Sequence, residues 1–339
     1  MASILNPDFF DHGQDITVWL MRIKDVPTTL NVFDTSDGVY YAVNISSGEL
    51  ISKHRIDLFN GDLVELNGVI LPLSAGDDFL LIGGNITDVG ESYIPIIWSY
   101  NVLSKTIVQK SFIKEKFPQF DYQWSPQIAS YDSINNIVYL NADLNGGPVL
   151  LKFDYNQQKE DVMTLPGDGW YIQSSYNETT NTCYMGGQNE VANQYAQMVV
   201  ATYNSVTGDT TTNTIKFDIP DSCYYSTVMY QYNSLFYSAL TAGTGYCPGY
   251  VFQVDIVGNT TTLIATIPTV DTFPINGGKS FVFDPVNGYL AMVATNYEDF
   301  SKLEICMVNL NTYQVDLYAI PNALVLQIRT EDEFLMTLS

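Results

Sequence analysis

The sequence repeats one short β-rich unit six times, and this regularity constrains the fold more than any single motif does. Each copy has alternating apolar residues, then Asn or Asp, a short polar turn and a second β-rich run, as in YAVNISSGELIS and FQVDIVGNTTTLI. The anchors of the six copies are Asn44, Asn101, Asp154, Asn204, Asp255 and Asn309. Successive anchors are about 50 to 57 residues apart, so each period has room for a further pair of strands.

A second hairpin unit lies between the anchored units. Its copies are SAGDDFLLI, ASYDSINNIVYL, SSYNETTNTCYM, VMYQYNSLFY, FVFDPVNGYLAM and QIRTEDEFLM. Each has two β-rich runs around a turn of Asp, Asn or Gly, which is the sequence form of a β-hairpin. Helical periodicity is absent, so we expect one all-β domain over residues 1–339, with an irregular N-terminal segment over 1–15.

Two hairpins per period resemble a blade of the β-propeller superfamily, with strands A and B from the second unit and strands C and D from the anchored unit. The resemblance is one of architecture: W-D dipeptides, the double-Gly kelch signature and the sialidase box are absent, so it points to no named family. Six copies favour six blades, while the β-like residues 14–34 support seven as the alternative. The first anchored unit lacks a preceding hairpin and the last hairpin lacks a following unit. We therefore expect N- and C-terminal strands to pair and close the ring.

The composition limits which classes of partner and which cellular compartment we expect. There are 14 basic and 37 acidic residues, a formal net charge of −23, which argues against nucleic acid as a partner. No apolar run reaches the roughly 18 residues of a membrane helix, so we expect no membrane insertion. Scarce Lys and four glycosylation sequons favour a secreted protein whose signal peptide has been replaced, with a cytoplasmic protein as the alternative. The sequon residues are Asn44, Asn85, Asn177 and Asn259.

In a propeller the D–A and B–C connections share one face, here called the loop face, and the A–B and C–D turns share the opposite turn face. The predicted loop face combines aromatic rings with polar side chains, a pairing that suits sugars because the rings stack on pyranose C–H groups. The predicted ligand-binding residues are Tyr122, Trp124, Asp168, Trp170, Tyr171, Tyr224, Tyr246 and Tyr297. We expect about half of these loop-face aromatics to be packing residues. The first functional hypothesis is therefore non-catalytic recognition of a glycan or another extracellular ligand.

Two other functions stay open. Carboxylates on the loop face could act as general acid and base in a hydrolase or lyase, and the candidates are Asp121, Asp168, Asp221 and Glu298. Histidine-dependent catalysis is disfavoured because the chain has only His12 and His54. A protein-interaction scaffold is the third hypothesis, and it requires an exposed apolar patch on one face.

Metal and cysteine chemistry adds further predictions. Residues 141–147 partly match a calcium loop, which makes Asp143 and Asn145 candidate calcium ligands; apart from calcium we expect no cofactor. Cys223 and Cys247 fall near each other on the predicted loop face and could form a disulfide, whereas Cys183 and Cys306 fit buried strand positions. The predicted inner strands carry polar residues that would line a central channel, among them Ser130 and Ser174.

Overall fold

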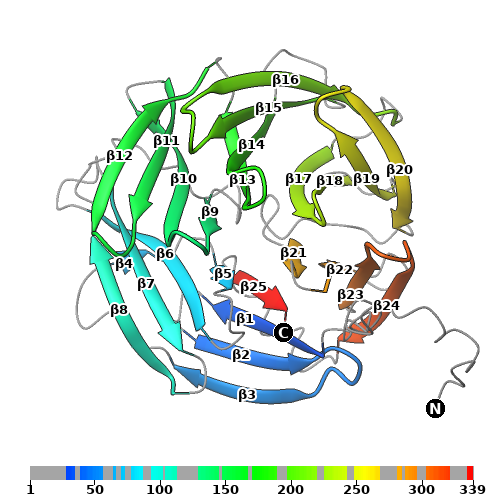
Figure 1. The fold of residues 1–339 in the computed structure, drawn as a ribbon. Coiled ribbons are helices and arrows are strands. Elements are labelled where there is room, and N and C mark those ends of the chain that lie inside the picture. Colours follow the sequence, from blue (N-terminus) through cyan, green and yellow to red (C-terminus); the bar gives the residue numbers. More distant parts are fainter. Residues whose placement is uncertain are drawn as a thin grey trace, which may run out of the picture.

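All the regular structure is β in the part of the chain that the structure describes. The computed structural model describes residues 28–34, 39–55, 64–65, 70–72, 78–86, 93–101, 104–112, 129–144, 147–166, 170–188, 197–219, 225–242, 248–267, 281–284, 287–295, 303–320 and 334–338. These residues form 25 strands in six antiparallel sheets that lie around a common centre (Figure 1). No described segment is a helix long and apolar enough to cross a membrane.

We number the sheets I to VI along the chain and give each from its innermost to its outermost strand (Figure 1). Sheet I consists of β25 (Phe334–Leu338), β1 (Thr29–Asp34), β2 (Val39–Asn44) and β3 (Leu50–Arg55). Sheet II has two short inner strands, β4 (Val64–Glu65) and β5 (Ile70–Pro72), which both pair with β6 (Asp78–Ile86), followed by β7 (Tyr93–Asn101) and β8 (Thr106–Phe112). Sheet III consists of β9 (Ala129–Asp132), β10 (Ile137–Leu144), β11 (Gly147–Asp154) and β12 (Lys159–Thr164).

The other three sheets have four strands each. Sheet IV consists of β13 (Trp170–Asn177), β14 (Thr182–Gln188), β15 (Gln197–Asn204) and β16 (Thr210–Lys216). Sheet V consists of β17 (Tyr225–Tyr232), β18 (Leu235–Ala242), β19 (Gly249–Asp255) and β20 (Thr260–Ile267). Sheet VI consists of β21 (Phe281–Asp284), β22 (Tyr289–Thr295), β23 (Leu303–Asn309) and β24 (Val315–Ile320). The strand order confirms the prediction that the second hairpin unit supplies the two inner strands and the anchored unit the two outer ones.

Sheet I joins strands from the two ends of the chain, as the sequence predicts. β25 pairs antiparallel with β1, with Leu30 opposite Leu338 and Asp34 opposite Phe334. The contribution of each end differs from the prediction: the C-terminal end supplies one described strand, and Thr29–Asp34 supplies the second inner strand. The seven-blade alternative rested on residues 14–34. Of these, Thr29–Asp34 belong to sheet I, and residues 14–27 lie outside the described part of the chain.

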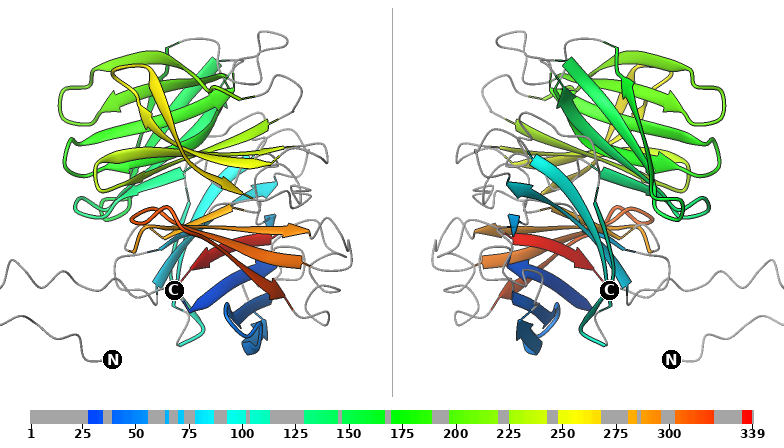
Figure 2. Two further views of the ribbon diagram at one scale, coloured as in Figure 1. Left: turned by 90° about the vertical axis from the view of Figure 1, so that its right-hand side faces the viewer. Right: turned by 90° about the vertical axis from the view of Figure 1, so that its left-hand side faces the viewer.

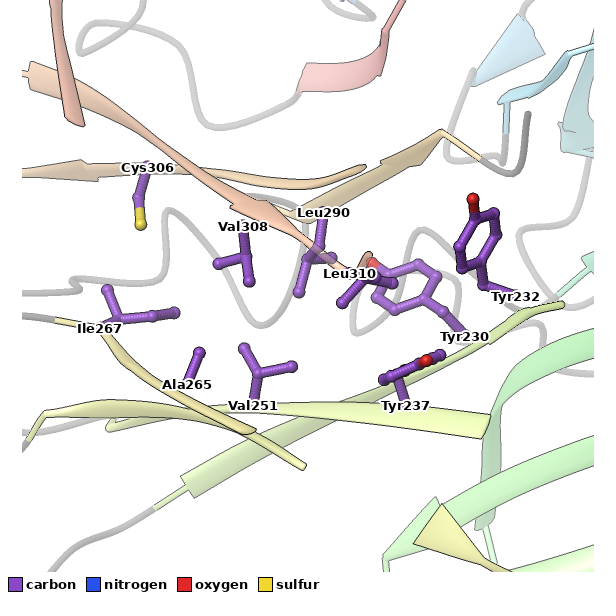
Figure 3. Packing of buried hydrophobic residues seen from close by; sticks show 10 residues of the cluster. All are labelled: Tyr230, Tyr232, Tyr237, Val251, Ala265, Ile267, Leu290, Cys306, Val308 and Leu310. Atoms are coloured by element: carbon purple, nitrogen blue, oxygen red, sulfur yellow. The ribbon is translucent and has the colours of Figure 1, made fainter. Parts of the chain in front are cut away.

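The core lies between neighbouring sheets, because a sheet in the ring packs against a neighbour on each of its two faces. In β11, Leu150 packs toward sheet IV, whereas its neighbour Leu151 packs toward sheet II, since successive side chains of a strand point to opposite faces. Between sheets V and VI, the side chains of Val251 and Ile267 face those of Cys306 and Val308 (Figure 3). This two-sided burial explains why adjacent residues of β11, from Val149 to Leu151, are all apolar and buried.

Two polar residues predicted to line the central channel lie between sheets instead. Ser130 of β9 and Ser174 of β13 are buried, and their hydroxyl oxygens are 2.7 Å apart. Both hydroxyls also contact the sulfur of Cys183, at 3.6 and 3.4 Å. The hydroxyls therefore satisfy each other in the contact between sheets III and IV.

Candidate functional site

Most of the predicted loop-face residues lie outside the described part of the chain. This applies to Asp121, Tyr122, Trp124, Asp168, Asp221, Tyr224, Tyr246, Tyr297 and Glu298, and to Asn145, Cys223 and Cys247. Trp170 begins β13, but its side chain is outside the description. The glycan site, the carboxylate pair and the Cys223–Cys247 disulfide therefore stay predictions.

Tyr171 is the one predicted ligand residue whose side chain is described, and it has a packing role. It is buried in the core between sheets III and IV and donates a hydrogen bond from its hydroxyl to the carbonyl of Pro166 at 2.7 Å. Burial raises the pKa of its hydroxyl. Its ring is therefore a packing residue of this core and is not accessible to a ligand.

The predicted calcium loop is mostly a pair of strands. Asn141 is buried within β10 opposite Leu150, and Asp143 lies opposite Pro148, so only Asn145 and Gly146 connect β10 to β11. Among the described residues, no group of three His, Cys, Asp or Glu side chains is placed to hold a metal ion. Calcium binding by Asp143 and Asn145 stays a prediction, because it depends on side chains outside the description.

The four sequon asparagines have different environments. Asn177 is only 4% exposed, and its Oδ1 accepts hydrogen bonds from the backbone N–H groups of Thr179 and Thr180, which leaves little room for a glycan. Asn44 is half-buried, and its Oδ1 accepts a bond from the hydroxyl of Ser46 in the same sequon. Asn259 is exposed in a turn. Asn85 lies within β6.

The turn face is built from one repeated C–D turn, and the anchor residue of each repeat forms it. In sheets III to VI the anchor Oδ1 accepts hydrogen bonds from the backbone N–H groups two and three residues later, an Asx turn. For Asp255 the two donors are Val257 and Gly258, at 3.1 and 2.9 Å. This geometry explains why the anchor is Asn or Asp in every copy of the unit.

The residue after the anchor attaches the C–D turn to the rest of its sheet. It is buried in four sheets, as Ile45, Tyr155, Ile256 and Leu310. In sheets I, III, IV and VI its N–H also donates to the carbonyl before the second strand, and the acceptors are Thr28, Asn136, Asn181 and Gly288. In sheets I, III and VI the turn is therefore fixed by both an apolar contact and backbone hydrogen bonds.

Three aliphatic side chains stand out on this rigid face. Val257 is 93% exposed, Val206 is 74% exposed and Ile134 is 68% exposed. They lie in turns of the consecutive sheets V, IV and III. Turns of neighbouring sheets lie at the same side of the ring (Figure 2), and Leu235 and Tyr313 add partly exposed apolar surface in sheets V and VI. We call these five residues, which are distributed over the turns of four sheets, the apolar turn patch.

The turns do not require apolar residues at these positions. The position of Val206 and Val257 is taken by Ser46, Asn156 and Asn311 in three of the equivalent turns and by Leu103 in the fourth. The position of Ile134 in the A–B turn is taken by Thr179 in sheet IV. Polar residues therefore support the same backbone, so the apolar turn patch needs an explanation other than folding.

Acidic groups lie on the same turns. Glu178 accepts hydrogen bonds from both the backbone N–H and the hydroxyl of Ser133, next to Ile134, and so links the turns of sheets IV and III. Asp209 lies three residues after Val206 and is exposed. Acidic side chains therefore lie on the same turns as the apolar turn patch.

The described histidine and thiols lie at contacts between sheets. His54 Nε2 is 2.6 Å from the hydroxyl of Tyr100, a bond that joins sheets I and II. Burial, and secondarily the charge of Lys105, lowers the pKa of His54. Cys183 and Cys306 are free and buried, as predicted, and burial raises the pKa values of their thiols to about 11 and about 12. Such thiols are poor nucleophiles at neutral pH.

Comparison with known proteins agrees on the fold and does not identify a family. No protein-family model matches this chain, and no curated protein matches it. TolB from Acinetobacter baumannii is similar to it with 9% identity and a TM-score of 0.54, covering 91% of this chain and 65% of TolB. A chain of a nidogen/laminin complex is similar with 7% identity and a TM-score of 0.51, covering 91% of this chain and 97% of that one. The chain thus spans less than two thirds of the TolB length, and identities this low show the fold alone. The six radial sheets and these likenesses together establish that the chain has a β-propeller fold.

Proposed function

We propose that this propeller is a non-catalytic protein-interaction scaffold that binds a protein partner through its turn face. The observation that carries the proposal is the exposure of Ile134, Val206 and Val257 in turns that polar residues would serve equally well. An exposed apolar patch on one face is the feature that the scaffold hypothesis requires.

The energy of covering the patch is large enough to matter. Burying one aliphatic side chain of this size contributes about 1.5 to 3 kcal/mol. Three such residues on turns held by Asx hydrogen bonds lose little conformational entropy on binding, because the backbone is already ordered.

The charge of the chain indicates which partner surface would fit. The formal net charge is −23, and Glu178 and Asp209 lie beside the patch. A partner surface that is apolar at its centre and basic at its rim would bury the aliphatic side chains and would be attracted at long range. We therefore expect a protein partner with that surface.

The test compares the wild type with a variant that carries Ile134→Thr, Val206→Ser and Val257→Ser. These changes copy the polar residues of the equivalent turns, so the fold is kept while the aliphatic surface is removed. Quantitative affinity enrichment from the source cells would identify proteins lost with the variant. The dissociation constant of each purified partner would then be measured by calorimetry, and we expect it to rise at least about 100-fold, the equivalent of roughly 2.7 kcal/mol.

A matched control separates the patch from general surface hydrophobicity. Leu263→Ser removes an aliphatic side chain of 49% exposure from the outer strand β20. We expect this change to leave the affinity within twofold. Equal binding by the triple variant and the wild type would refute the proposal.

The carbohydrate hypothesis concerns the opposite face and is a separate proposal for the loop-face residues. A glycan array probed with and without calcium tests it. Loss of binding in Trp124→Ala or Trp170→Ala would support it, and loss of binding with a chelator would support a calcium site at Asp143.

A further inference from the structure

Strand β3 is the outermost strand of sheet I (Figure 1). It pairs with β2, and no described strand pairs with its other edge. Four of its six side chains are exposed, and only Ser52 and His54 are partly covered. These two side chains point to the same face of sheet I, because side chains alternate along a strand. The attachment of β3 to the neighbouring sheet therefore depends on very few side chains.

The imidazole of His54 connects β3 to sheet II. Its Nε2 is 2.6 Å from the hydroxyl oxygen of Tyr100 in β7. The centre of its ring is 4.8 Å from that of Tyr40, the residue directly opposite it in β2. Both tyrosines are buried. The half-buried imidazole therefore rests on a buried pair of aromatic residues where sheets I and II meet.

The other ring nitrogen of His54 is not prepared to carry a proton. Nδ1 is buried and has no hydrogen-bond partner among the described residues. The neutral ring accommodates this when Nε2 carries the hydrogen and donates it to Tyr100, because Nδ1 is then only an acceptor. The protonated ring has an N–H group on both nitrogens, and a buried charged donor without an acceptor is costly. Protonation therefore favours an arrangement in which the ring is in water.

The tyrosines that face His54 offer it no negative charge. Tyr40 comes from β2 and Tyr100 from β7, and burial raises the pKa of each hydroxyl to about 12. Both hydroxyls therefore stay neutral at physiological pH. His54 is the group of this cluster that changes its charge between pH 7.5 and 5.

The charged side chains around His54 are cationic in the described part of the chain. Lys105, which precedes β8, lies close enough for its ammonium to lower the pKa of His54, in addition to the larger effect of burial. On β3 itself, Lys53 and Arg55 flank His54. No described carboxylate is among the groups that shift the pKa of His54. A proton on the imidazole would therefore meet repulsion at this place.

We propose that His54 is a pH-sensitive switch that holds β3 against sheet II when the ring is neutral and releases β3 when the ring is protonated. The protonated ring can reach water because β3 is the outermost strand and His54 is only half-buried. Release loosens sheet I, the sheet that joins the two ends of the chain, from its outer edge. This inference does not use the apolar turn patch and goes beyond the proposed function.

Hydrogen exchange of the full chain, measured by peptide mass spectrometry at pH 7.5 and pH 5, tests the release. Protection at each pH is corrected for the intrinsic exchange rate. We expect the protection of residues 50–55 to fall at least about threefold from pH 7.5 to pH 5, because the released strand binds the proton more tightly. The internal control is β16, an outermost strand without histidine, whose protection should stay within about 1.5-fold.

Three variants separate the switch from a general loosening in acid. His54→Gln keeps a hydrogen-bonding side chain without a titratable ring, so the protection of residues 50–55 should be equal at both pH values. Lys105→Gln removes the neighbouring cation, so the pKa of His54 should rise and the midpoint of release should move to higher pH. Lys216→Gln is the matched control, because Lys216 is an exposed cation on β16, and it should leave the midpoint unchanged.

Three results would overturn the proposal. The first is unchanged protection of residues 50–55 between the two pH values in the wild type. The second is the same fall in His54→Gln as in the wild type. The third is an equal fall over residues 50–55 and over β16, which would show that acid loosens the whole ring. None of these results bears on the proposed function, because the apolar turn patch is unchanged in every variant.

Discussion

The ring of Tyr232 in sheet V lies against the backbone of Gly288 in sheet VI, so that a Cβ atom on residue 288 would overlap with Cζ and Cε1 of the ring. The Tyr232 hydroxyl then donates to Asn311 Oδ1 at 2.9 Å, and Gly288 has φ +72°. We expect Gly288→Ala to lower the free energy of unfolding by about 3 kcal/mol or more, because left-handed strain and overpacking add. Urea unfolding followed by circular dichroism measures this.

Gly208 is the matched control for this prediction. It has φ +78°, but a Cβ atom there would meet nothing within 4 Å. Gly208→Ala should therefore cost only the left-handed strain, about 1 to 2 kcal/mol. Tyr232→Ala should relieve part of the cost of Gly288→Ala in a double-mutant cycle, and simple additivity would argue against the ring contact.

Substitutions of an Asx-turn anchor should show whether the oxygen acceptor or the negative charge stabilises the turn. Asp255→Ala removes the acceptor for two backbone N–H groups and should cost about 1 kcal/mol, whereas Asp255→Asn keeps the acceptor and should cost much less. Thermal unfolding of the two variants tests this. Equal losses would show that the carboxylate charge is what stabilises the turn.

His54 should make stability depend on pH. Its pKa in the folded protein is lowered from 6.5 by burial and by Lys105, so the unfolded chain binds the proton more tightly. The contribution is present above pH 6.5 and is lost as the pH falls through that value toward the lower folded pKa. The free energy of unfolding of the wild type should therefore decrease between pH 7.5 and 5.5 more steeply than that of His54→Gln. Parallel profiles would exclude His54 as the source.

The buried thiols should be protected from reagents. Cys183 and Cys306 should resist iodoacetamide at pH 8 in the native protein and react after unfolding, because both are buried and their pKa values are raised. Peptide mass spectrometry reads each site separately. Rapid native labelling of Cys183 would contradict its burial.

The repeat period of the sequence predicted the fold well, because each repeat forms the same turn and that turn requires the same residue types. Asn204 and Asp255 were visible as anchors since each accepts two backbone hydrogen bonds in its turn. The pairing of the chain ends was visible because an inner hairpin was missing before Asn44. The sequence did not show which segment supplies the second inner strand of sheet I. Thr29–Asp34 pairs with residues about 300 positions away, and such pairing leaves no local pattern.

The candidate site was harder to predict, because exposure depends on which residues neighbouring sheets cover. Val257 and Ile256 are adjacent and equally apolar, yet Ile256 is buried and Val257 is almost fully exposed. The signal that could have found the patch is the alignment of the repeats, where Val206 and Val257 occupy a position that is polar in three other copies. For Tyr171, an aromatic residue next to a polar loop, sequence could not separate packing from binding.

The pairing of β1 with β25 also orders events during synthesis. A ribosome adds about 5 to 20 residues per second, so Thr29–Asp34 leaves the ribosome many seconds before Phe334–Leu338 is made. During that interval the inner edge of β1 has no partner strand, while the later sheets can already pack in sequence. The nascent chain therefore carries an open edge for most of its elongation, and that edge is the place where we expect a chaperone to act.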